Sequence, residues 1–125
     1  MSGAKRFAAL FFRTGTGKEP VREWFQELPA ADRRIVGRDL LTLELGWPVG
    51  MPLARSLGEG LWELRSNLSG GRTARVVFFV APGHLVLVNA FIKKTRKTPK
   101  GDLELAGQRK REWERARGKG KGRTG

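Results

Sequence analysis

The residues best suited to chemistry in this chain are its arginines and lysines. Five of the ten residues from Phe91 to Lys100 are basic, and they follow an apolar run directly. A planar guanidinium matches the shape of a phosphate group, and a lysine whose pKa is lowered by neighbouring cations can transfer a proton. A solvated basic surface is the alternative interpretation of such a run. Convergence of other basic residues on this segment would favour a phosphate-binding site over a solvated surface.

The chain has few residues suited to metal binding or to nucleophilic catalysis. The chain has one histidine, His84, no cysteine and no tyrosine. A metal site needs several nitrogen, sulfur or oxygen ligands at a working spacing, whereas His84 stands alone beside an expected turn. Its position also argues against a histidine-activated nucleophile. We therefore expect no metal and no cofactor, and an active site built from arginine and lysine.

Length and charge limit the possible classes of protein. The 125 residues are enough for one domain, and the formal net charge of +13 favours a polyanionic partner, nucleic acid first. No run approaches the roughly 20 apolar residues that a membrane-spanning helix needs. The apolar run from Phe7 to Phe12 is too short for a signal peptide, and the lack of cysteine suits a cytoplasmic protein. We expect a cytoplasmic, non-membrane protein.

Hydrophobic periodicity predicts the elements that would position these residues. The predicted order is a strand, a helical hairpin, three strands in a meander and a C-terminal helix. Pro20 and Gly46 are typical of the first and last positions of such a hairpin. The fold class is therefore α+β, with helices packed on a small antiparallel sheet. The predicted ranges are strand 5–13, helices 20–28 and 31–45, loop 46–60, strands 61–66, 72–80 and 84–92, and helix 101–117, with Asp102 as its candidate cap.

One domain, residues 1–117, holds all of these elements, and residues 118–125 (GKGKGRTG) are predicted to form a flexible basic tail. The first strand is expected to insert between or beside the later ones.

The meander brings basic residues from three strands to one end of the sheet. If Pro82-Gly83 is a two-residue hairpin loop, Arg75 lies opposite Ala90 and Arg72 opposite Lys93. Arg65 ends the neighbouring strand. This convergence favours a phosphate-binding site over a plain solvated surface.

Arg75 is the most informative of these residues, because its neighbours Val76, Val77 and Phe78 are apolar. An arginine in an apolar strand costs free energy unless it is paired or reaches solvent. One interpretation is structural: an edge-facing arginine, or one paired with Glu63. The other is functional: a fixed guanidinium presented to a phosphate.

The segments LARSLGEGLWELR, GGRTARVVFFV and LVLVNAFIKKTRKTPKGDLELA together resemble the phage-derived, HigB-like branch of the RelE/ParE toxin superfamily. The resemblance covers residues 53–107. It implies a RelE-like fold and the toxin of a toxin–antitoxin pair. HigB-like and RelE-like toxins are ribosome-dependent endoribonucleases (mRNA interferases) that cut mRNA and inhibit translation without a metal.

The resemblance also implies site residues. Arg65, Arg75, Lys93 and Lys94 match the catalytic positions, with Arg65 and Arg75 at the phosphate and one of the two lysines as base or acid. Several relatives use a tyrosine or histidine near the C-terminus for proton transfer, and this chain has neither there. The residues expected to bind RNA around them are Arg55, Arg72, Arg96, Lys97 and Lys100.

The expected partners are mRNA on the ribosome and a cognate helix-turn-helix antitoxin, with DNA contacted only through that antitoxin. Two alternatives share the same charge pattern. One is a ParE-like toxin that inhibits DNA gyrase. The other is a nucleic-acid-binding module without catalysis, whose binding would be salt-sensitive.

Overall fold

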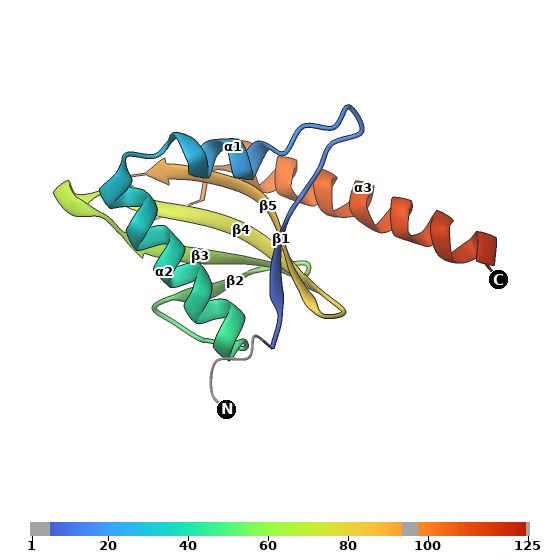
Figure 1. The fold of residues 1–125 in the computed structure, drawn as a ribbon, viewed down its shortest axis with the longest axis horizontal. Coiled ribbons are helices and arrows are strands. Elements are labelled where there is room, and N and C mark those ends of the chain that lie inside the picture. The colour runs from blue at the N-terminus through green and yellow to red at the C-terminus, as the bar shows by residue number, and fades with distance from the viewer. Residues whose placement is uncertain (1–5, 94–97, 125) are drawn as a thin grey trace.

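The computed structural model describes residues 6–93 and 98–124, with side chains as far as residue 117. Figure 1 shows one curved sheet with helices α1 and α2 on one face and helix α3 on the other. The α+β class is confirmed. The elements are β1 (Ala8–Phe11), α1 (Pro20–Glu27), α2 (Ala30–Gly46), β2 (Ala54–Gly58), β3 (Leu61–Asn67), a short 3-10 turn (Ser69–Gly71), β4 (Thr73–Ala81), β5 (His84–Lys93) and α3 (Lys100–Thr124).

The sheet has five strands in the order β1-β5-β4-β3-β2. Strand β1 pairs with β5 in parallel, while the other pairs are antiparallel, so the sheet is mixed. The helical hairpin was predicted correctly, with Pro20 opening α1 and Trp47 following the end of α2. Between the two helices and the sheet lies the larger core, which includes Val36, Leu43 and Phe78.

Strand β2 corrects the prediction that residues 46–60 form a loop. It pairs with β3 and places Arg55 opposite Glu63. The strand is short, and its turn into β3 has positive φ angles at Gly58, Glu59 and Gly60. Glycine favours such a backbone. The glycines needed for this tight turn are what made the segment look like a loop.

A bulge in β5 corrects the predicted register between β4 and β5. Near the turn the pairing is as predicted, but Val77 pairs with Asn89 while Phe78 pairs with Leu87, so Val88 is an extra residue. Beyond it, Arg75 lies opposite Phe91 instead of Ala90, and Lys93 lies opposite Thr73 instead of Arg72. A bulge leaves an unpaired residue that changes which way the following side chains point.

Helix α3 is attached to the sheet at this bulge. The Arg109 guanidinium donates to the Val88 carbonyl oxygen at 2.7 Å. The Asn89 amide donates to the backbone carbonyl of Asp102 at 3.2 Å and to its carboxylate at 3.0 Å. Further along, Trp113 packs edge-on against Phe79 with the ring centroids 5.4 Å apart. The helix therefore lies across the face of the sheet that carries Arg75.

The helix boundaries differ from the prediction. Helix α3 begins at Lys100, so Asp102 lies in its first turn and accepts hydrogen bonds from Asn89 instead of capping the helix. It also extends to Thr124, through the segment predicted to be a tail. The flexibility of that segment and the domain limits remain predictions. Within the described ranges, no helix is both long and apolar enough to cross a bilayer.

Candidate functional site

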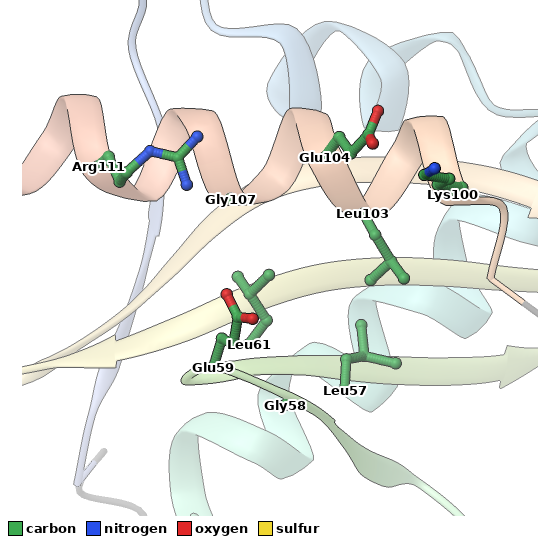
Figure 2. A pocket seen from close by; sticks show the side chains of 9 residues that line it. All are labelled: Leu57, Gly58, Glu59, Leu61, Lys100, Leu103, Glu104, Gly107 and Arg111. Carbon is green, nitrogen blue, oxygen red and sulfur yellow. The ribbon is translucent and has the colours of Figure 1, made fainter.

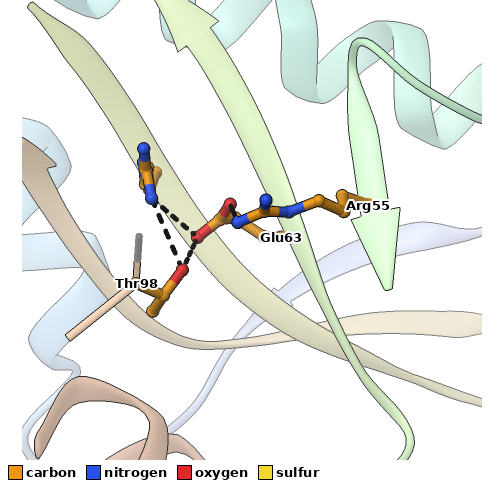
Figure 3. A network of polar contacts seen from close by, with 4 residues as sticks. Arg55, Glu63 and Thr98 are labelled. Carbon is orange, nitrogen blue, oxygen red and sulfur yellow. Dashed lines mark hydrogen bonds and ion pairs between the residues drawn. The ribbon is translucent and has the colours of Figure 1, made fainter. Parts of the chain in front are cut away.

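A buried polar network lies between β2, β3, β4 and the start of α3 (Figure 3). The Glu63 side chain is fully buried, and Arg75 is 1% exposed. Glu63 accepts from Arg55 at 3.0 Å on one carboxylate oxygen, and its other oxygen lies 3.7 Å from an Nη of Arg75. The Thr98 hydroxyl donates to Glu63 and accepts from Arg75 at 3.5 Å. We call Arg55, Glu63, Arg65, Arg75 and Thr98 the arginine cluster.

Strand register explains why these residues meet. Arg55 is paired with Glu63, and Arg65 with Arg75. Because side chains alternate along a strand, Glu63 and Arg65 fall on one face of the sheet, which is the face covered by α3. The Arg75–Glu63 contact that the sequence offered as a structural alternative is therefore present, and two further arginines adjoin it.

The arginine cluster has an excess of positive charge. It contains three guanidiniums and one carboxylate, which leaves two positive charges. Burial lowers the pKa of the Arg75 guanidinium; the Glu63 carboxylate opposes that change, whereas the charges of Arg65 and Arg55 add to it. Cations held close together repel one another, so an anion placed among them would be favoured.

Among the other predicted site residues, the structure describes Lys93 and Lys100. Lys93 is half-buried opposite Thr73, on the side of the sheet that carries Phe91 and Arg75. Lys100 is exposed at the start of α3, directly after Thr98 and Pro99. Lys94, Arg96 and Lys97 lie outside the described residues. The structure thus brings Arg55, Arg65 and Arg75 together, with Lys93 beyond them along the sheet.

Arg72 is not part of the arginine cluster. It precedes β4 and binds Asp32 of α2 with two hydrogen bonds, at 2.9 and 3.1 Å. That contact lies with α2, across the sheet from α3. The sequence grouped Arg72 with Arg75 from its position along the chain, and the Asp32 partner, 40 residues away, gave no local signal.

The Asp32–Arg72 pair yields a prediction for stability against pH. Hydrogen bonds from Arg72 lower the pKa of the Asp32 carboxyl, and its burial opposes them. A lowered pKa in the folded state means that the pair's stabilisation is present above the ordinary carboxyl pKa and is lost as the pH falls below it. Asp32→Asn should therefore lower the urea midpoint at pH 7.

As the pH falls towards 2.5, the gap between Asp32→Asn and the wild type should shrink to less than half its value at pH 7. Glu27→Gln, a change at an exposed carboxylate on α1, serves as the control and should show no such trend. A gap that is equally large at both pH values would contradict the assignment of Asp32 as the titrating partner.

An apolar-floored cavity of about 360 Å³ adjoins the cluster, between α3 and the β2–β3 hairpin (Figure 2). Leu57, Leu61 and Leu103 form its floor, and Lys100 and Arg111 stand at its rim on α3. Leu57 and Leu61 belong to the strands that carry Arg55 and Glu63. The cavity therefore continues the same face of the sheet.

Metal ligands do not gather anywhere in the described part of the chain, where no group of three or more His, Cys, Asp or Glu could hold an ion.

Among the network residues, Thr98 was not singled out from the sequence. It lies in the KTP triplet of the basic run, where its neighbours suggested charge and not a buried hydroxyl.

Comparison with protein families finds a match over most of the chain. The model of a family described as "Phage derived protein Gp49-like (DUF891)" matches residues 23–111, more than two thirds of the chain. The matched range includes every member of the arginine cluster as well as the first half of α3. A search of curated proteins finds no match.

Proposed function

The chain belongs to the Gp49-like family of phage-derived proteins, a toxin-like family related to the RelE/ParE-type toxins, and on this premise we propose that it cleaves mRNA on the ribosome. The observation that carries the proposal is the arginine cluster, with three guanidiniums and one carboxylate on a single face of the sheet. The excess charge suits the phosphate of a scissile bond. The run KKTRKTP, which resembles HigB-like toxins, favours the ribonuclease side of the superfamily.

The proposed reaction is attack of an RNA 2′-hydroxyl on the adjacent phosphate. A bond forms between the 2′-oxygen and phosphorus while the bond from phosphorus to the 5′-oxygen breaks, giving a cyclic phosphate and a free 5′-hydroxyl. Arg65 and Arg75 would stabilise the charge that builds up on the phosphate oxygens. Lys93 or Lys94 would take the 2′ proton or supply the 5′ proton.

Burial distinguishes the roles of the arginines. Arg75 is 1% exposed and has Thr98 against it, whereas the Arg55 side chain is 32% exposed and Arg65 is half-buried. Direct contact with phosphate is therefore easiest for Arg55 and Arg65. Arg75 would contact the phosphate when the Thr98 side chain moves aside, and otherwise adds its charge from within the low-dielectric interior. Lys100, with Arg96 and Lys97, would extend the phosphate contacts along the RNA.

Membership of a toxin-like family implies a cognate antitoxin. We expect a helix-turn-helix protein with an acidic surface facing the cluster, because complementary charge speeds association and suppresses wrong partners. Such a partner would also shield the cluster from RNA.

The test is to induce the chain in growing cells and to map the 5′ ends of translated mRNA. We expect growth arrest and new 5′ ends that fall at a fixed position within codons and disappear when translation initiation is blocked. Growth arrest with DNA breaks and intact mRNA would instead favour the gyrase-inhibiting class. Salt-sensitive RNA binding with neither effect would reduce the chain to a binding module.

A further inference from the structure

A second cavity, of about 370 Å³, lies where α2 approaches the end of β3. Arg65 is the residue that this cavity shares with the arginine cluster. The volume is within the range of sites that hold small organic ligands. The lining residues come from three segments: Ile35, Arg38 and Asp39 of α2, Pro52 and Leu53 before β2, and Arg65 and Asn67 of β3.

The walls of the cavity combine apolar and cationic groups. Ile35 and Leu53 are partly buried against the larger core, so they form a fixed apolar surface. Arg38 is exposed and Arg65 is half-buried. Unpaired RNA bases are held in proteins by apolar contact, by stacking on guanidinium planes and by hydrogen bonds to their edges. The first two kinds of group are present here.

Asp39 supplies the third kind of group, one that can form hydrogen bonds with the edge of a base. Its side chain is half-buried on α2, and within the described ranges it has no hydrogen bond or ion pair. An ionised carboxylate accepts hydrogen bonds and donates none. Guanine presents two adjacent N–H donors on its Watson–Crick edge, and these match the two oxygens of a carboxylate. Uracil has one N–H on that edge, between two carbonyl oxygens, and those oxygens and the carboxylate repel each other.

We propose that the cavity between α2 and the end of β3 binds the base of the nucleotide next to the phosphate held at the arginine cluster, and that Asp39 selects guanine there. The inference rests on the proposed ribonuclease function and names the part of the substrate that this site reads. Arg65 links the two subsites, because it adjoins Arg75 and also lines the cavity.

The first measurement is binding, without cleavage. The probes are 2′-O-methyl RNA tetranucleotides with one guanine, adenine or cytosine among uracils, and the all-uracil sequence. The guanine tetramer should bind about tenfold tighter than the all-uracil one, the discrimination that a good bidentate contact gives. Amide chemical shifts of Ile35, Asp39 and Leu53 should move on titration. Equal Kd values for all four tetramers would overturn the proposal.

Variants distinguish the preference for guanine from the overall affinity for RNA. Asp39→Ala should reduce the guanine preference to less than twofold while leaving the Kd of the all-uracil tetramer within twofold of the wild type. Leu53→Trp, which fills the cavity, should weaken all four tetramers. Arg34→Ala, an exposed arginine on α2 outside the cavity, is the matched control and should keep the preference. A guanine preference that survives in Asp39→Ala would assign it to another residue.

The second measurement distinguishes failure of this inference from failure of the proposed function. On translated mRNA, wild-type cleavage should cluster beside guanine, and Asp39→Ala should spread it over other bases. Guanine-selective binding by a wild type that cuts no RNA would remove the ribonuclease function and keep the subsite. Cleavage by Asp39→Ala at the same guanine-adjacent positions would keep the function and remove the subsite.

Discussion

Glu63→Ala is expected to lower the free energy of unfolding by about 3–5 kcal/mol, the range found when one partner of a buried ion pair is removed. The fully buried carboxylate is the negative charge that lies between Arg55 and Arg75, with Arg65 close by. Without it, three guanidiniums face one another across a largely buried space. The measurement is urea unfolding at pH 7, followed by tryptophan fluorescence.

A double variant tests whether the loss comes from uncompensated charge. Glu63→Leu combined with Arg75→Met replaces both buried charges with apolar side chains of similar length, an exchange that other proteins often tolerate. We expect it to recover at least half of the stability lost in Glu63→Ala. A double variant as unstable as Glu63→Ala would show that packing around Glu63, and not charge, causes the loss.

Arg65→Met is expected to lower single-turnover mRNA cleavage on the ribosome by about 100-fold or more, the effect of losing one preorganised donor at a developing anion. Methionine keeps an apolar stem of similar length, so folding should change little. Arg75→Ala should reduce cleavage by a similar factor, but it also breaks the buried contact with Glu63. The Glu63→Leu, Arg75→Met variant removes the Arg75 charge without leaving that carboxylate behind.

Arg34→Met is the matched control for the cleavage measurements, because Arg34 is exposed on α2 and lies outside the cluster and both cavities. It should cleave at the wild-type rate. Cleavage by a folded Arg65→Met protein at that same rate would remove Arg65 from the proposed catalytic group. Normal cleavage by the Glu63→Leu, Arg75→Met protein would leave Arg75 with a structural role alone.

Local sequence patterns were sufficient for most of the fold. The apolar spacing around Val36 and Leu43 and the stop signals at Gly46 to Pro48 gave the helical hairpin, and alternation placed Glu63 and Arg65 on one face of their strand. These features depend on neighbours within about one or two turns of chain, which the sequence displays directly.

Features set by contacts between distant segments were not predictable in the same way. The parallel pairing of β1 with β5 joins residues that are more than 70 positions apart, and no local pattern specifies it. The position of Arg72 outside the arginine cluster depends on its ion pair with Asp32 of α2. The burial of Arg75 depends on α3 and Thr98 covering that face, which a strand pattern cannot show.

Part of the arginine cluster was predicted from the sequence. Sequence reasoning identified Arg65 and Arg75 by their convergence and named Glu63 as a structural partner of Arg75, and the structure joins all three. Arg55 was proposed only through the resemblance, since β2 was not foreseen. Its contact with Glu63 follows from the pairing of β2 with β3.

The extra residue in β5 changes which residues of the strand face α3. Before Val88, even-numbered residues such as Val86 lie on the α3 side; beyond it, the odd-numbered Phe91 takes that side and Ala90 the other. Lys93 follows Phe91 in the same frame. A strand that lacked Val88 would keep Lys93 opposite Thr73, because Leu87 and Asn89 on either side of it already pair with the adjacent residues Phe78 and Val77. The bulge thus absorbs the extra residue locally, and the placement of Lys93 on the α3 side depends on the strand pairing that follows it.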